Sequence, residues 1–141
     1  MAVKISIAEI INKLQDLKAK EEKIDWLRKN DNVALRTILK YTYDSKIEFL
    51  VPDTPPPWNK NEFEDEAKSL LYREARRLKI FIKGGGYDNL NKIKRETLFI
   101  QLLQDVDNDD ADVLCVMISK KPFKGLTLKT LNEAFPGLIE A

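Results

Sequence analysis

The sequence contains no histidine and a single cysteine, Cys115. Without histidine, the chain has no histidine general base, no Ser-His-Asp triad, no Cys-His pair and no histidine metal ligand. One cysteine excludes an internal disulfide and a CxxC zinc cluster, and it suits a reducing cytoplasm. We therefore expect no catalytic residue, no metal site, no cofactor and no small-molecule substrate, so the protein is predicted not to be an enzyme.

Long apolar runs are also missing. No stretch approaches the roughly 20 apolar residues of a membrane span. The first four residues, Met-Ala-Val-Lys, lack the apolar run of a signal peptide. We expect a cytoplasmic protein with no membrane partner.

The net charge is small, because 24 basic side chains face 23 acidic ones and give +1. As an average, this value argues against a strongly basic nucleic-acid binder. Along the chain, however, residues 76–95 hold seven basic and one acidic side chain, and residues 96–113 hold six acidic and no basic ones. A phosphate beside the basic block feels mainly the local charge, since screening is effective beyond about 10 Å. The alternative is an ordinary solvated face with uneven charge.

The spacing of apolar residues predicts an all-α chain. A length of 141 residues suits one domain, residues 1–141. Apolar side chains recur at helical intervals and predict a bundle of six or seven helices. The expected segments are 7–17, 21–28, 33–43, 63–82, 90–103, 109–118 and 127–134. A proline-rich segment, 51–61, is predicted to be an ordered surface loop anchored by Trp58, with an SH3-type ligand as the alternative.

The most informative motif runs from Arg76 to Leu90. Four cations precede three glycines, and a new helix is expected to begin directly afterwards, with its N–H groups free. Such a place binds phosphate well, through backbone amides and the helix dipole. The alternative is a helix end with favourably placed cations. We call residues 83–90 the first basic turn. The candidate DNA-binding residues in this turn and on the helix end before it are Arg76, Arg77, Lys83, Gly84, Gly85 and Gly86.

A second motif repeats this arrangement. Three lysines lead into a glycine and then into a threonine that can cap the last helix. The threonine hydroxyl and the following lysine could hold a second phosphate, whereas the alternative is ordinary helix capping. We call residues 120–127 the second basic turn. The candidate DNA-binding residues in this turn and at the start of the next helix are Lys120, Lys121, Lys124, Gly125, Thr127 and Lys129.

Five aspartates between residues 105 and 112 resemble the start of an EF-hand loop. Asp110 stands where that loop needs glycine, and Val116 where it needs glutamate. We interpret this segment as a solvated acidic turn that opens a helix. Cys115 lies in the apolar run that follows and is predicted to be a buried structural thiol.

Taken in order, the motifs resemble the N-terminal DNA-binding domain of ATP-dependent DNA ligases, especially those of T-even-type phages. The resemblance extends over residues 7–139. The segments that carry it are 23–30 with Leu35 and Tyr41-Thr42-Tyr43, then 70–86, 112–118, 125–130 and the closing Phe-Pro-Gly-Leu-Ile of residues 135–139. In these ligases the domain wraps duplex DNA over the minor groove and mainly contacts phosphates.

The resemblance implies a role for both basic turns. It transfers phosphate contacts to Lys83 and the three glycines, and to Lys124, Gly125, Thr127 and Lys129. No Lys-x-Asp-Gly motif occurs, so a free-standing, non-enzymatic module of phage DNA metabolism is implied. Duplex DNA is the expected partner, bound weakly and without sequence preference. The alternative is a phage protein-interaction adaptor or a virion-structural component with a phage or host protein partner.

Overall fold

The computed structural model describes residues 7–51, 75–106 and 108–139, and nearly all of its regular structure is helical. The elements are α1 (Ile7–Lys13), η1 (Leu14–Asp16), α2 (Lys20–Lys29), α3 (Val33–Tyr43), η2 (Ala75–Phe81), α5 (Lys92–Asp105), α6 (Asn108–Ser119) and α7 (Leu128–Ala134), where η marks a 3₁₀ helix. The predicted all-α class is confirmed. The expected proline-rich loop and the first part of the expected helix 63–82 lie outside the described residues.

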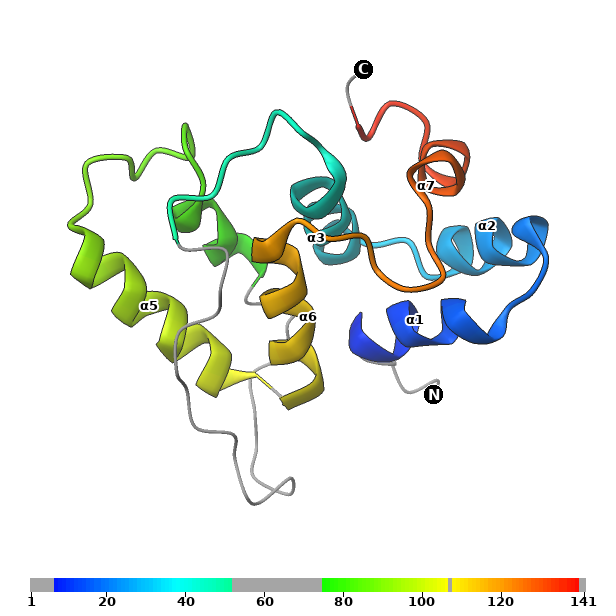
Figure 1. The fold of residues 1–141 in the computed structure, drawn as a ribbon, viewed down its shortest axis with the longest axis horizontal. Coiled ribbons are helices and arrows are strands. Elements are labelled where there is room, and N and C mark those ends of the chain that lie inside the picture. Colours follow the sequence, from blue (N-terminus) through cyan, green and yellow to red (C-terminus); the bar gives the residue numbers. More distant parts are fainter. Residues whose placement is uncertain (1–6, 52–74, 107, 140–141) are drawn as a thin grey trace.

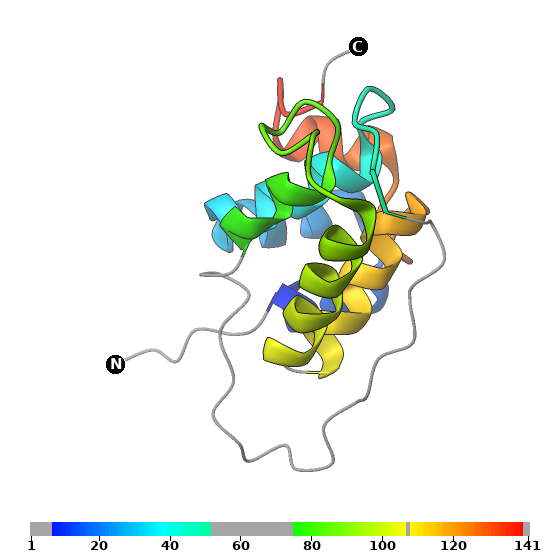
Figure 2. The same ribbon diagram turned by 90° about the vertical axis from the view of Figure 1, so that its left-hand side faces the viewer.

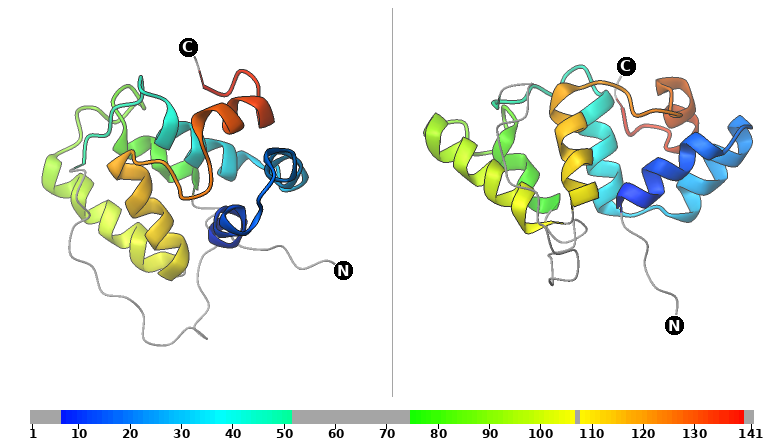
Figure 3. Two further views of the ribbon diagram at one scale, coloured as in Figure 1. Left: turned by 45° about the vertical axis from the view of Figure 1, so that its right-hand side comes forward. Right: turned by 60° about the horizontal axis from the view of Figure 1, so that its bottom comes forward.

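Helix α6 is the centre of the arrangement. It packs against α1, α3 and α5, while α2 packs against α7 and η2 against both α3 and α5. Figure 1 shows α5 and η2 on one side of the α3–α6 pair, and α1, α2 and α7 on the other. Figure 2 shows α5 running beside α6, and Figure 3 shows α3 and α6 side by side in the middle. The two basic turns are therefore connections at different parts of this bundle.

Two predicted helix starts are confirmed by their caps. The Asn32 side chain accepts a hydrogen bond from the Leu35 N–H at 2.8 Å and opens α3. The Thr127 hydroxyl accepts one from the Thr130 N–H at 3.2 Å and opens α7. Short polar side chains favour these positions because they satisfy amides that lack a helical partner.

The expected α-helix over the described residues 75–82 is wrong. These residues form the 3₁₀ helix η2, followed by an antiparallel bridge between Phe49 and Ile82. Ala75, Leu78 and Phe81 are buried at intervals of three, which matches the three residues per turn of a 3₁₀ helix. The Leu50 N–H donates to the Phe81 carbonyl at 2.7 Å, so the chain is already extended where the first basic turn begins.

The core joins side chains from every helix that surrounds α6. Leu14, Leu35, Phe99 and Leu114 are all fully buried. The rings of Phe81 and Phe99 meet edge to face, with their centroids 5.1 Å apart. Across the described ranges, every helix is too short or too polar to cross a membrane.

Candidate nucleic-acid interface

Several backbone amides of the first basic turn, and of the helix start that follows it, are bonded within the chain. The Gly84 N–H donates to both carboxylate oxygens of Asp88, each at 3.0 Å. At the start of α5, the N–H groups of Ile93 and Lys94 donate to the Asn91 side-chain oxygen. The helix expected over residues 90–103 with a cap at Asp88 or Asn89 starts later, because Asp88 bonds the glycine turn instead and Asn91 caps α5 at Lys92. The expectation of free N–H donors at this helix start is wrong for Ile93 and Lys94, since the Asn91 side-chain oxygen already accepts from both.

Arg95 holds this turn from inside. It is the last cation of the basic block 76–95, but it is only 5% exposed. Its guanidinium donates to the carbonyls of Ile80, Tyr87 and Asp88 at 3.3, 2.8 and 3.4 Å. The spacing of residues along the helix already indicates this burial, because Arg95 lies on the same face of α5 as Phe99 and Leu102. Arg95 is therefore a structural residue of the first basic turn.

The remaining candidates of the first basic turn are surface groups with different surroundings. Arg76 is exposed, whereas Arg77 pairs with Asp105 at 3.2 Å. The Lys83 ammonium lies 3.8 Å from Glu48, and both side chains are mostly exposed. Gly84 and Gly86 are exposed, but a Cβ on Gly85 would lie 2.1 Å from the Lys79 carbonyl oxygen. The fold itself therefore requires Gly85 to be glycine.

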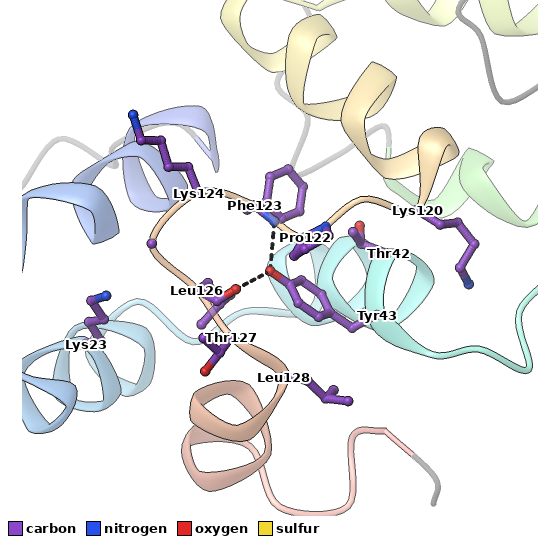
Figure 4. A pocket seen from close by; sticks show the side chains of 11 residues that line it. Lys23, Thr42, Tyr43, Lys120, Pro122, Phe123, Lys124, Leu126, Thr127 and Leu128 are labelled. Atoms are coloured by element: carbon purple, nitrogen blue, oxygen red, sulfur yellow. Dashed lines mark hydrogen bonds between the residues drawn. The ribbon is translucent and has the colours of Figure 1, made fainter.

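The second basic turn borders a groove of about 660 Å³ between α2, α3 and the start of α7. Its lining residues are Lys23, Thr42, Tyr43, Lys120, Pro122, Phe123, Lys124, Gly125, Leu126, Thr127 and Leu128. Figure 4 shows Lys23 and Lys124 on one side of the turn, and Lys120 and Leu128 on the other. Among the described residues that line this groove, none is acidic. Lys23 was not among the predicted site residues, because it lies on α2, far from the turn in sequence.

Tyr43 holds the turn together from α3. Its hydroxyl accepts a hydrogen bond from the Phe123 N–H at 2.8 Å and donates one to the Leu126 carbonyl at 2.8 Å (Figure 4). Burial raises the pKa of Tyr43 to about 12, against the smaller lowering effect of the Phe123 amide. One phenol therefore fixes both ends of the segment that carries Lys124.

Replacing Tyr43 with phenylalanine should destabilise the protein by about 1–2 kcal/mol, because the Phe123 N–H and the Leu126 carbonyl both lose their partner.

The same two hydrogen bonds of Tyr43 make the stability of the protein depend on pH. The pKa of Tyr43 is higher in the folded chain than its ordinary value of 10, so its contribution is fully present below pH 10 and is lost between pH 10 and about 12. Urea unfolding measured across this pH range should therefore show a smaller fall in the free energy of unfolding for Tyr43→Phe than for the wild type. Parallel falls would contradict this assignment.

Lys120 points away from the other groove lysines and into the protein. Its ammonium donates to the carbonyls of Asp44 and Ile47, the latter at 2.8 Å, and lies 5.9 Å from the centre of the Phe49 ring. Burial lowers the pKa of Lys120, while the nearby Asp44 carboxylate acts in the opposite direction. These contacts hold the segment after α3, so the Lys120 ammonium is already engaged within the protein.

The other candidates of the second basic turn differ in what they contact. Lys121, Lys124 and Lys129 are exposed. The Thr127 hydroxyl donates to the Thr130 hydroxyl at 3.0 Å in addition to capping α7, so its role here is local. Gly125 has a φ of +88° and packs against the backbone of Leu14 and Gln15. Its close approach is therefore to the protein's own η1 helix.

The two basic turns lie apart along the long axis of the molecule. In Figure 1 the green turn before α5 is at the left, and the orange turn before α7 crosses the middle and right. Of the two, the second basic turn combines a groove, lysines from separate elements and an acid-free lining. It is therefore the stronger candidate interface.

Residues 10–123 match the model of a family of unknown function (DUF6433). The chain belongs to this family. The match covers the first basic turn and the groove residues from Lys23 to Phe123, and it ends before Lys124. A search of curated proteins finds no match. Across the described ranges, no group of three or more cysteine, aspartate or glutamate side chains is placed to hold a metal ion.

Proposed function

We propose that this DUF6433 member is a non-enzymatic DNA-binding module that contacts the phosphates of duplex DNA without sequence specificity. The observation that carries the proposal is the groove beside the second basic turn. Lys23 from α2 and Lys124 from the turn both line it, and its described lining has no carboxylate to compete with a phosphate (Figure 4). Lysines in such a place bind DNA by neutralising phosphates and releasing counterions.

The residue types of the groove favour contacts to the DNA backbone over contacts to bases. Base-specific recognition commonly uses arginine, asparagine or glutamine in bidentate hydrogen bonds. None of these occurs among the described lining residues. Few phosphate contacts and a net charge of +1 give weak binding that falls as the salt concentration rises, with a slope set by the small number of contacts.

The resemblance to the DNA-binding domain of phage-type ligases supports the same role. It suggests a protein of phage DNA metabolism that acts in the host-cell cytoplasm and approaches DNA from the minor groove. The first basic turn would supply a second, weaker contact. The exposed lysines in and beside this turn are Lys79, Lys83, Lys92 and Lys94.

Reversing the charge of Lys23 and Lys124 together should weaken duplex binding at least about tenfold at low salt, because two phosphate contacts become repulsive. Fluorescence anisotropy with a labelled duplex at low and moderate salt measures this. The wild type should lose affinity between the two salt concentrations, and the Lys23→Glu/Lys124→Glu variant should show a shallower salt slope.

The matched control is Lys92→Glu/Lys94→Glu. This variant has the same net charge, but its changes lie on the first turn of α5, away from the groove. We expect a smaller loss of affinity. An equal or larger loss would show that the main DNA contact is at the first basic turn and not at the groove. No duplex binding by the wild type even at low salt would refute the proposal.

A protein partner is the alternative function, and exposed apolar side chains favour it. Ile93 is 74% exposed on the first turn of α5, and Tyr87 in the preceding turn is 42% exposed. Apolar groups among lysines suit an acidic partner surface. A pull-down after nuclease treatment separates the two functions. A partner that survives nuclease, together with no duplex binding at low salt, would favour the adaptor or virion role.

A further inference from the structure

A second, smaller cavity lies farther along α3 and α7. It has a volume of about 300 Å³ and is lined by Arg36 and Lys40 of α3 and by residues 134–138 at the end of α7. The groove described above takes Tyr43 from the last turn of α3 and Leu128 from the start of α7. Positions 36, 40 and 43 are spaced by four and three residues, so they share one face of α3. The groove and this cavity, which we call the seam pocket, therefore follow one another along the same two helices.

Arg36 is held in a fixed orientation at the seam pocket. Its Nε and Nη2 groups donate to the two carboxylate oxygens of Asp31 at 2.5 and 2.6 Å, and its guanidinium lies 5.1 Å from the centre of the Phe135 ring. A guanidinium has five N–H donors, and Asp31 accepts from only two of its nitrogens. Asp31 does not line the pocket, and the Arg36 side chain is 49% exposed. The other donors of Arg36 can therefore bind an oxyanion in the pocket.

Lys40 adds a second cation one turn farther along α3. Among the described residues, no carboxylate pairs with its ammonium, and the described lining of the pocket contains no acid. The last carbonyls of α7 would repel an anion. However, those of Glu133 and Ala134 accept hydrogen bonds from Arg28 at 2.9 and 3.2 Å, which reduces that repulsion. The seam pocket therefore offers two cations to an anionic ligand.

We infer that the seam pocket is a second phosphate site for the DNA strand that contacts the groove, an inference that rests on the proposed function. Arg36 and Lys40 bind one phosphate of that strand, and arginine suits this role because its planar fork can hold two phosphate oxygens at once. At a rise of 1.5 Å per residue, Arg36 lies about 10 Å from Tyr43 along α3. A DNA strand advances about 3.4 Å per nucleotide along the duplex. The groove and the seam pocket thus contact phosphates a few nucleotides apart.

The first test replaces Lys40 and measures duplex binding by fluorescence anisotropy over a range of salt concentrations. The slope of log affinity against log salt reports the number of phosphate contacts, at about 0.9 per contact. Lys40→Gln should bind severalfold more weakly at low salt, with a slope shallower by about 0.9. The matched control is Lys13→Gln, because Lys13 is exposed on α1 in a separate hollow that also contains Glu9 and Asp16. It should keep the wild-type slope, and equal losses in the two variants overturn the inference.

The second test removes the Arg36 guanidinium without changing the net charge. Asp31→Asn/Arg36→Gln deletes both members of the ion pair, so the net charge stays at +1. This variant should also lose affinity severalfold and have a shallower salt slope, because the site and not the overall charge has changed. Thermal unfolding checks that it is folded. A folded variant with the wild-type affinity and slope overturns the inference.

These measurements also separate the inference from the proposed function. If Lys23→Glu/Lys124→Glu weakens duplex binding but the seam-pocket variants behave like Lys13→Gln, the groove alone binds DNA and only the inference is overturned. If the wild type binds no duplex even at low salt, the proposed function is refuted and the inference falls with it.

Discussion

Gly125→Ala should destabilise the protein by about 3 kcal/mol, from left-handed backbone strain and overpacking together. Gly125 has a φ of +88°, which side-chain-bearing residues rarely adopt. An added Cβ would also lie 2.9 Å from the Gln15 nitrogen and 3.0 Å from the carbonyl carbon of Leu14. Both neighbours are backbone atoms and cannot rotate away. Thermal unfolding should show a melting temperature lower by about 10 °C.

The control for this prediction is Gly137→Ala. Gly137 has a similar φ of +85°, but no atom lies within 4 Å of an added Cβ. Its replacement should cost about 1–2 kcal/mol, the backbone strain alone. If both variants lose the same stability, the close approach of the second basic turn to η1 contributes nothing, and the argument for Gly125 fails.

Asp110→Ala should destabilise the protein by about 2–3 kcal/mol, because a buried amide loses its acceptor. Asp110 is 3% exposed on the first turn of α6, and its carboxylate accepts a hydrogen bond at 2.9 Å from the N–H of Ala8. Ala8 is the second residue of α1, so a side chain from one helix satisfies the start of another. Denaturant unfolding at neutral pH measures the loss.

Asp109→Ala is the matched control for Asp110. Asp109 stands in the same first turn of α6 but is exposed, so its removal should cost only about 0.5 kcal/mol through the helix dipole. Equal losses for the two variants would show that the Ala8 amide gains no special stability from the Asp110 carboxylate. Because Asp110 is buried and accepts the Ala8 N–H, our interpretation of residues 105–112 as a solvated acidic turn is wrong at Asp110.

Local signals predicted much of the fold. The caps at Asn32 and Thr127 follow from short polar side chains placed before apolar residues with helical spacing, and both are present. The boundary at α5 could not be predicted in this way, because Asp88, Asn89 and Asn91 are all good capping residues. The choice between them depends on Arg95 and Gly84. Arg95 donates to the Tyr87 and Asp88 carbonyls and the Gly84 N–H donates to the Asp88 carboxylate, so these two residues belong to the turn and not to the helix.

The candidate site was predicted only in part. Lys124 and Gly125 were among the predicted residues because they lie in one motif of the sequence, and both line the groove. Lys23 was missed, because its place beside the turn results from the packing of α2 on α7. Lys120 was included with its neighbours, yet the turn after α6 directs its ammonium toward the Asp44 and Ile47 carbonyls.

The sequence by itself determined the helical class, because hydrophobic period and capping residues act over a few neighbouring positions. It also located the basic segments and, through the absence of histidine, excluded histidine chemistry. Only the tertiary structure decided which charges face solvent. Arg95, Asp110 and Lys120 hold the fold, whereas Lys23 and Lys124 border the groove. The physical reason is that solvation and hydrogen bonding of a charged group depend on residues that are distant in sequence and adjacent only after packing.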